Sequence, residues 1–387
     1  MSKEEKRAPE VRFEGFYDDW KQRKLGELLK YEQPTKYMVK STDYDDKFET
    51  PVLTAGQSFI LGYTDETDGI KEASSDNPVI IFDDFTTSSH YVGFPFKVKS
   101  SAMKLLSLVS DVDDFYFVYN VLSNLNYTPQ SHERHWISKF SEFNVFVPKH
   151  DEQKSIGTFF QQLDNLITLH QRKLEQLREL KKAALQYLFP KKDEAEPKVR
   201  FANFMDDRWS SYKIKDIFLE RLEKSGEGEL ISVTINSGVV KASELDRKDN
   251  SSLNKTNYKS VKRHDIAYNS MRMWQGASGY SPYNGIVSPA YTVITPKQGI
   301  NSKFFSFMFK KNEMIQAFKR NSQGLTSDTW NLKFPVLSSI KVKVPKTEEQ
   351  DKIEQYMNNL DNIIKLYQGK LENFQDTKKA FLQKMFI

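Results

Sequence analysis

Two histidines three residues apart, His132 and His135, are the residues whose spacing first suggests chemistry. They flank Glu133 and Arg134, which gives the segment a superficial likeness to a metal-binding pair. The surrounding sequence has the composition of a loop, and the chain contains no cysteine. Because protein zinc sites need three or four convergent ligands, this pair alone does not predict a metal site.

Two pairs of neighbouring acids, Asp18–Asp19 and Asp83–Asp84, could supply the carboxylates of a nuclease. Asp is also common in turns and at helix caps, and we expect these structural roles here. The sequence has no GxxxxGK or GxGxxG phosphate loop. It also lacks the Asn-Pro-Pro-aromatic and Asp-Pro-Pro-aromatic tetrapeptides of amino-methyltransferases. With no cysteine, thiolate-zinc sites and cysteine nucleophiles are excluded. The residues therefore predict a protein that is not itself a catalyst.

The elements that would position any site come in two copies, which match at their edges and diverge in the middle. The entry segments 9–20 and 197–209 both contain Pro-x-Val-Arg-Phe and then Phe-x-Asp-Asp before a Trp. The closing segments 147–189 and 344–386 share Val-Pro-Lys, Glu-Gln, Leu-Asp-Asn, Lys-Leu-Glu and Lys-Lys-Ala at a constant offset. One unit has therefore been duplicated around centres that differ, which favours recognition of two different things over two copies of one reaction.

Each closing segment carries apolar residues at alternating spacings of four and three, the pattern of a coiled coil. The pattern predicts helices over 151–189 and 347–387, each about 55 Å long. Glu152 and Glu349 suit the first turns, where the helix dipole favours an acid. A helix of this length exceeds what one small domain covers, so packing of the two helices on each other is preferred over packing on their own domains. The predicted coiled-coil interface comprises Ile156, Phe160, Leu163, Ile167, His170, Leu174, Leu177, Ile353, Met357, Leu360, Ile364, Tyr367, Leu371 and Phe374.

The two helices are expected to be antiparallel. Each follows its own globular middle, so antiparallel packing places the globules at opposite ends and makes the helix pair a spacer. His170 and Tyr367 occupy equivalent positions near the helix midpoints. We expect them to meet as a polar central layer, because polar residues in such an interface fix its register.

The divergent middles have the patterns of mixed α/β domains. In the first, the predicted strands are 78–82 and 92–98, and the predicted helix is 114–125. In the second, the predicted strands are 266–269 and 290–294, and the predicted helix is 304–319. The charged segment 191–197 ends in Pro and is expected to link the copies. The fold class predicted is α+β, with two pseudo-two-fold-related α/β domains separated by two long antiparallel coiled-coil helices.

Composition is compatible with a polyanionic partner without demanding one. The 387 residues include 38% apolar, 28% charged and 13% aromatic residues, enough for two ordinary domains, and the net charge of +5 is mild. Positive charge is concentrated in residues 255–274 and 310–320. No stretch approaches the ~18 apolar residues of a membrane helix, and no apolar segment follows the charged residues 1–7. We expect a cytoplasmic protein.

These features together resemble the specificity subunits of Type I restriction–modification enzymes. The resemblance rests on two divergent domains, each preceded by Phe-x-x-Phe-x-Asp-Asp-(x)-Trp and followed by Pro-Lys-x-x-Glu-Gln and a long Leu-Asp-Asn-x-Ile helix, and it covers essentially the whole chain. It implies a bacterial defence protein that reads double-stranded DNA, with each target recognition domain reading one half of a split sequence. It further implies that the repeats dock two methyltransferase subunits, which bind S-adenosylmethionine and methylate adenine, and that motor-nuclease subunits using ATP and Mg join them. No cofactor is expected on this chain itself. The implied order is a first recognition domain (1–150), a first spacer helix (151–189), a linker and entry segment (190–212), a second recognition domain (213–346) and a second spacer helix (347–387).

The resemblance also implies which residues contact DNA. In the family, a loop late in each recognition domain, before the final strand and long helix, touches DNA. We call the segments 127–134 and 320–327 the late loops; the first lacks the Gln-Gly step of the second. The segments 86–90 and 269–275, the mid loops, are further candidates. The candidate DNA-binding residues are Thr86, Thr87, Ser88, Ser89, His90, Gln130, His132, Arg134, Asn269, Ser270, Arg272, Gln275, Arg320, Asn321, Gln323, Thr326 and Ser327. Trp136 and Trp330 recur in both copies, so they are expected to be packing anchors.

Two functions of other classes stay open at this point. A coiled-coil adaptor that binds only protein would have no DNA affinity, whereas binding through phosphates weakens steeply with salt. A stand-alone nuclease would cut DNA as the purified chain.

Overall fold

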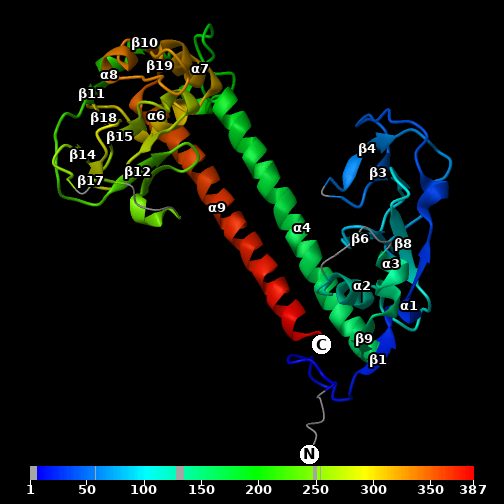
Figure 1. Cartoon of the computed structure of the whole chain (residues 1–387). Helices are drawn as coiled ribbons and strands as arrows, with labels where there is room; N and C mark the ends of the chain where they lie inside the picture. The colour runs from blue at the N-terminus through cyan, green and yellow to red at the C-terminus, as the bar shows by residue number, and fades with distance from the viewer. Residues whose placement is uncertain (1–6, 57, 128–134, 247–250, 253) are drawn as a thin grey trace, which may run out of the picture. The chain divides into compact units, whose positions relative to one another are not determined.

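The computed structural model describes residues 7–56, 58–127, 135–246, 251–252 and 254–387. The chain forms two compact units, unit 1 (Met1–Gln171 with Gly369–Ile387) and unit 2 (Arg172–Gln368). Two helices of 38 residues, α4 (His150–Tyr187) and α9 (Thr347–Lys384), each contribute to both units (Figure 1). Each unit therefore combines most of one repeat with the end of the long helix of the other. Among the described residues, no helix has the length and apolar character needed to cross a membrane.

Unit 1 mixes short strands with a few helices. Its strands are β1 (Lys21–Lys24), β2 (Leu29–Glu32), β3 (Thr50–Leu53), β4 (Ile60–Thr64), β5 (Val79–Asp83), β6 (Ser89–Val92), β7 (Lys97–Val98), β8 (Met103–Leu108) and β9 (Asn144–Val147). Its helices besides α4 and α9 are α1 (Leu25–Leu28), η1 (Pro34–Tyr37), α2 (Phe115–Ser123), α3 (His135–Ser138) and η2 (Phe140–Glu142).

Unit 2 has the same character. Its strands are β10 (Ser210–Lys213), β11 (Phe218–Glu220), β12 (Ile231–Thr234), β13 (Gly238–Lys241), β14 (Lys259–Val261), β15 (Ile266–Asn269), β16 (Ser278–Tyr280), β17 (Gly285–Val287), β18 (Tyr291–Pro296) and β19 (Lys341–Val344). Its helices besides α4 and α9 are η3 (Ala202–Phe204), α5 (Ile214–Ile217), η4 (Ala242–Glu244), η5 (Met273–Gln275), α6 (Ser302–Met308), α7 (Asn312–Asn321) and α8 (Phe334–Leu337).

The two divergent middles share one sheet topology despite their different sequences. In unit 1 a four-stranded sheet has the order β2-β8-β5-β6, and in unit 2 the corresponding order is β11-β18-β15-β16. Every neighbouring pair in both sheets is antiparallel. A two-stranded sheet also recurs, β1 with β9 and β10 with β19, and joins each entry segment to the strand before a long helix. The mid loops therefore connect equivalent strands.

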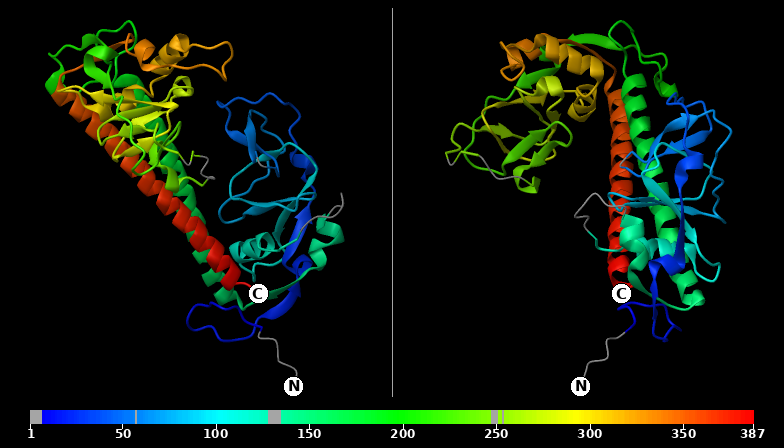
Figure 2. Two further views of the ribbon diagram at one scale, coloured as in Figure 1. Left: turned by 60° about the vertical axis from the view of Figure 1, so that its left-hand side comes forward. Right: turned by 45° about the vertical axis from the view of Figure 1, so that its right-hand side comes forward.

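The long helices pack antiparallel within each unit. In unit 1 the Lys378 ammonium on α9 lies 2.6 Å from the Asp164 carboxylate on α4. In unit 2 the equivalent ion pair joins Lys181 of α4 to Asp361 of α9. Both views in Figure 2 show the last part of α9 beside the first part of α4, within unit 1. The antiparallel direction predicted from the repeat is confirmed.

Aromatic side chains tie each entry Trp to the helices. In unit 1 the Trp20 ring lies 5.7 Å from Phe117 and 6.5 Å from Phe386, which follows α9. In unit 2 the Trp209 ring lies 6.0 Å from Phe304 and 6.4 Å from Phe189, which follows α4. These rings belong to the main core of each unit. Phe386, at the end of the second repeat, thus packs in the core of unit 1, and Phe189, at the end of the first repeat, packs in the core of unit 2.

The expected elements are largely present. Strand 266–269 matches β15, strand 78–82 overlaps β5, and helix 114–125 corresponds to α2. The Asp114 carboxylate caps α2 by accepting a hydrogen bond from the Phe117 amide at 2.8 Å. Two predictions were wrong: the single strand 92–98 is split between the ends of β6 and β7, and the single helix 304–319 is two helices, α6 and α7.

Between α6 and α7, two lysine side chains bond to distant backbone carbonyl oxygens; Lys311 is buried and Lys310 is partly buried. The Lys310 ammonium donates to the Gly276 carbonyl oxygen, and the Lys311 ammonium donates to the Pro190 carbonyl oxygen at 2.7 Å. These partners lie in different parts of unit 2. Helical periodicity alone does not reveal such long-range partners, so the sequence pattern reads as one helix.

Candidate nucleic-acid interface

The mid loop of unit 2 connects β15 to β16. Its first residue, Asn269, accepts a hydrogen bond from the Met271 amide at 3.0 Å, and the fully buried Met273 anchors its centre on the core. Asn269 and Gln275 are partly exposed and Arg272 is exposed, so these candidates are accessible to a ligand. Ser270 differs from them, because it is buried. Its hydroxyl lies 2.7 Å from the hydroxyl of Thr292 in β18 and is used within the fold.

Lys310 fixes the end of this mid loop. Its ammonium donates to the carbonyl oxygen of Gly276 at 2.5 Å and to that of Ile235 at 2.8 Å. Gly276 has a φ of 86°, a left-handed conformation that favours glycine. Burial, reinforced by the positive charge of Lys181, lowers the pKa of Lys310 to about 8. The loop is thus held by a partly buried lysine.

The late loop of unit 2 begins on a helix. Arg320 and Asn321 form the last turn of α7, so the expectation that they lie in a loop was wrong. Arg320 is exposed, whereas the Asn321 amide nitrogen donates to the Ala317 carbonyl oxygen at 2.8 Å. The remaining candidates are Gln323, Thr326 and Ser327, and all three are exposed.

Backbone pairing closes the late loop of unit 2 into a narrow turn. Gln323 and Asn331 exchange two backbone hydrogen bonds of 3.0 and 2.8 Å, and the Thr326 amide donates to the Thr329 hydroxyl at 3.1 Å. A Cβ on Gly324 would lie only 2.7 Å from the backbone of Thr329, so this close approach requires glycine. The loop tip is therefore held in one conformation by its own contacts.

The structure brings the mid and late loops of unit 2 together. The Leu332 amide, just after the late loop, donates to the Ser270 carbonyl oxygen at 2.8 Å. The Trp330 ring lies 5.2 Å from the Trp274 ring of the mid loop, and the Lys319 ammonium stands 5.8 Å above Trp330. Two segments chosen separately from the sequence thus form one surface. Trp330 is partly exposed, and its contact with Trp274 packs the late loop against the mid loop.

The mid loop of unit 1 is the tight turn between β5 and β6. Its Asp83 carboxylate accepts a hydrogen bond from the Phe85 amide at 2.8 Å, which confirms the turn role expected for this acid. Thr87 adopts a φ of 61°. The Ser88 hydroxyl donates to the Ala55 carbonyl oxygen at 3.0 Å, so this side chain is engaged within the fold.

The other candidates in this turn differ in accessibility. Thr86 is exposed, with its hydroxyl 3.0 Å from that of Ser88. Ser89 begins β6 and is partly buried. The His90 ring stacks on Phe59, with centroids 4.5 Å apart. The Thr87 hydroxyl donates to the Thr86 carbonyl oxygen at 2.7 Å, so Thr86 is the residue of this turn most accessible to a ligand.

Asp84 joins the mid loop of unit 1 to the residues that follow its late loop. The buried Asp84 accepts hydrogen bonds from the Trp136 amide at 3.0 Å and, through its carbonyl oxygen, from the His135 amide at 3.2 Å. Its carboxylate also lies 3.3 Å from the buried Lys104 ammonium. Asp84 therefore neutralises a buried cation. Trp136 is 2% exposed, which confirms its role as a packing anchor.

The candidates Gln130, His132 and Arg134 lie outside the described residues. Asp18 is exposed and pairs with Lys149 at 2.6 Å; its expected role as a turn or cap residue stays a prediction. Across the part of the chain that is described, no three His, Asp or Glu side chains gather closely enough to hold a metal ion.

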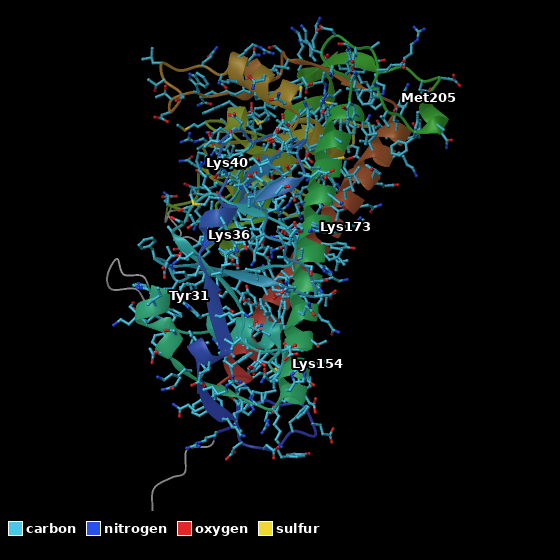
Figure 3. All side chains as sticks on the ribbon, turned by 90° about the vertical axis from the view of Figure 1, so that its right-hand side faces the viewer. Tyr31, Lys36, Lys40, Lys154, Lys173 and Met205 are labelled. Carbon is cyan, nitrogen blue, oxygen red and sulfur yellow. The ribbon has the colours of Figure 1, made fainter. Side chains whose placement is uncertain are left out.

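Much of the positive charge noted in the sequence is neutralised or turned inward. Lys262 lies 3.1 Å from the Glu223 carboxylate, and Lys259 is half buried with a pKa lowered by desolvation. In unit 1, Lys36 and Lys40 form ion pairs with Glu32 and Asp68; Figure 3 labels both lysines. Arg272 and Arg320 on the loop surface of unit 2 have no carboxylate among their hydrogen-bond or ion-pair partners in the described structure. A polyanion would therefore meet localised rather than general positive charge.

The fourteen predicted interface residues of the long helices are all buried or partly buried. His170 packs its ring 5.0 Å from Phe374 within unit 1, and Tyr367 packs on the core of unit 2. The meeting of His170 with Tyr367 concerns a contact between the units and stays a prediction.

Ion pairs that the sequence pattern did not predict fix each entry segment to a long helix. In unit 1 the Arg12 guanidinium donates two hydrogen bonds to the Glu152 carboxylate, at 2.8 and 2.7 Å. In unit 2 Arg200 makes the same two bonds to Glu349. The hydrogen bonds that each arginine donates to its glutamate carboxylate raise the pKa of the guanidinium. All four residues belong to the repeated text, and their joint recurrence was a signal that could have revealed the pairing.

Comparison with known proteins identifies the family. A sequence model of the Type I restriction modification DNA specificity domain matches residues 17–179 and again residues 206–374. The chain belongs to that family. The specificity subunit of the Type I restriction enzyme EcoR124I/EcoR124II from Escherichia coli is 50% identical over 137 residues, which is 34% of either chain. The specificity subunit of the MjaVIII enzyme from Methanocaldococcus jannaschii is 21% identical over 396 residues, or 94% of this chain and 91% of the relative.

A solved structure shares the fold. The Type I restriction-modification S subunit from M. genitalium has a TM-score of 0.67 to this chain, over 98% of this chain and 99% of that one. The sequence identity is 16%, so this likeness concerns the fold. The α+β class, with two specificity domains and long helices, agrees with what the repeat predicted.

Proposed function

We propose that this chain is the DNA-reading subunit of a Type I restriction–modification complex, and that each unit reads one half of a bipartite target. One observation carries the proposal: both units use the same hairpin of the same sheet to present loops of different composition. The mid loop offers Thr86 in unit 1 and Arg272 and Gln275 in unit 2. Hydroxyl, amide and guanidinium groups suit base edges and phosphates. Equivalent frames with different donors are what two different half-sites require.

We further propose that two methyltransferase subunits dock on the long helices. Leu166 and Leu169 are exposed on α4 in unit 1, at 37% and 61%. Ile363 and Leu366, their equivalents in the repeat, are exposed on α9 in unit 2, at 40% and 56%. Two matching apolar strips support two copies of one partner.

The docking proposal predicts stoichiometry. Leu169→Asp or Leu366→Asp should each remove one methyltransferase copy, and the double variant both, as counted by native mass spectrometry. Leu222→Asp, at another exposed leucine, is the matched control and should retain both copies. Retention of both copies by the double variant would refute this docking surface.

The chemistry of the complex is assigned to the partners. We infer that the methyltransferase subunits bind S-adenosylmethionine and methylate adenine, that motor-nuclease subunits use ATP and Mg, and that this chain works with them in the cytoplasm without a cofactor of its own. The support is membership of the specificity-domain family together with the absence of nucleotide-loop and methyltransferase motifs from the sequence. The spacing between half-sites is assigned to the antiparallel helices.

Genome-wide mapping of methylated adenine tests the function. Cells carrying this chain with its methyltransferase partner should show methylation at a split motif that is absent without this chain. Unchanged methylation, with the partner shown to be present and active, would favour an adaptor that binds only protein. Cutting of DNA by the purified chain would favour the nuclease.

A further inference from the structure

The tip of the late loop in unit 2 carries an apolar side chain with no contact in the fold. Leu325 is 102% exposed, more than any other large apolar residue among those described. An exposed leucine on a protein surface is ordinary, but this one stands at the end of a turn that the protein holds in place. The Gln323–Asn331 pairing and the glycine at position 324 fix the backbone on either side of it.

The surroundings of Leu325 suit a nucleic acid. Gln323, Thr326 and Ser327 are exposed around it and offer hydrogen-bonding groups. Arg320 lies just before them, in the last turn of α7. Beneath the turn, Trp330 packs on Trp274 and carries the Lys319 ammonium above its ring. An apolar tip surrounded by hydrogen-bond donors and cations is the arrangement by which proteins insert a side chain between base pairs, with the polar groups holding the backbone and base edges.

We propose that Leu325 enters the base stack of the half-site read by unit 2 and partly separates two neighbouring base pairs. This inference rests on the proposed function and adds a specific residue to it. Leu325 acts as a wedge whose fit depends on how easily the base step opens, and steps differ in stiffness according to sequence. It therefore contributes to specificity without a hydrogen bond to any base.

The side chain makes the proposal testable, because its full exposure means that replacing it leaves the folded chain unchanged. Leu325→Ala and Leu325→Asn should keep the melting temperature of the parent. Binding of the complete methyltransferase complex to its target should weaken about 10- to 100-fold, the loss expected when a buried leucine contact disappears. Leu325→Met, which keeps an apolar side chain, should restore binding. Leu222→Ala, at a leucine 73% exposed elsewhere in unit 2, is the matched control and should bind as the parent does.

The direct measurement is 2-aminopurine fluorescence, which rises when the base is unstacked. Duplexes carry the probe at each position of the second half-site except the methylated adenine, whose own movement would obscure the signal. The parent complex should raise the fluorescence at one base step, and Leu325→Ala should abolish that rise. A probe in the first half-site should respond equally with parent and variant.

The outcomes separate this inference from the proposed function. The wedge is refuted if the parent complex binds the split target without raising the fluorescence of any probe in the second half-site. It is also refuted if Leu325→Ala raises that fluorescence as much as the parent does. In either case the proposed reading function stands. If the complex shows no preference for any split target, the proposed function fails, and the wedge fails with it.

Discussion

The two units share their internal contacts and differ in the groups they present to solvent. In each, an arginine of the entry segment makes a two-bond ion pair with a buried glutamate at the start of a long helix, Arg12 with Glu152 and Arg200 with Glu349. The mid loops that these frames support have unrelated sequences. Interior contacts must be complementary in shape and charge, which restricts change, whereas the exposed positions of a surface loop tolerate many substitutions. The same frame can thus present two different reading surfaces.

The largest effect is expected at the shared ion pairs. Arg200→Ala leaves the fully buried Glu349 without its partner and should destabilise unit 2 by about 3–5 kcal/mol. Arg12→Ala should do the same to unit 1. Hydrogen exchange resolved by unit, in the full chain, measures each. Lys149→Ala, which breaks only an exposed pair, should leave the stability of unit 1 almost unchanged. Equal destabilisation of both units by Arg12→Ala would contradict the expectation that each ion pair stabilises its own unit.

The next effect concerns reading by one unit. Arg320→Ala removes an exposed guanidinium from the loop surface of unit 2 and should cost about 1–3 kcal/mol of binding, or roughly tenfold or more, at the second half-site only. Methylation mapping with degenerate targets shows which half of the motif has relaxed. Equal relaxation of both halves would contradict the assignment of one half-site to each unit.

A smaller effect, the dependence of stability on pH, should distinguish unit 2 from unit 1. The pKa of Lys310 is lowered to about 8 in the folded chain, below the ordinary lysine value of 10.5, so the unfolded chain binds more protons between these values. The free energy of unfolding should therefore rise by about 1–3 kcal/mol as the pH increases from 8 towards 10.5. Below pH 8 this stabilising contribution is absent. Lys310→Met should flatten this dependence in urea titrations of unit 2, whereas Lys319→Met, at an exposed lysine, should not. An unaltered pH profile in Lys310→Met would show that Lys310 is not the group responsible.

The smallest perturbation tests the proposed central layer. Because the chain has no cysteine, the double variant His170→Cys/Tyr367→Cys offers a single possible disulfide. Mild oxidation should form that bond within one chain, seen as a mobility shift without reductant, if the two positions meet. Persistent free thiols in the double variant would contradict the polar layer.

The sequence could predict whatever the duplication made visible. The long helices, their antiparallel direction and the role of Trp136 as a core anchor all followed from repeated text with regular spacing. The loop surface followed only in part. Arg320 and Asn321 were expected in a loop because the sequence does not show where α7 ends. Ser270 was expected at the surface because the sequence does not reveal its hydrogen bond to Thr292, which is distant along the chain.

Contacts between distant residues explain the other failures. Where the predicted helix 304–319 splits in two, Lys310 and Lys311 bond to the carbonyl oxygens of Gly276, just after the mid loop, and Pro190, after α4. The role of Asp84 depends on Lys104 and on residues beyond the late loop. These are tertiary contacts between segments without matching text, so neither periodicity nor the repeat pointed to them.

The Phe386 ring that packs on Trp20 also has a consequence for synthesis of the protein. A ribosome adds roughly 5–20 residues per second, so Phe386 emerges on the order of tens of seconds after the first recognition domain is complete. During that interval the nascent domain exposes the apolar site that Phe386 will fill. Unit 2 has no such delay, because Phe189 precedes the residues that it packs against. The first domain made should therefore be the last to become stable, and chains released early should be preferred substrates for cellular proteases.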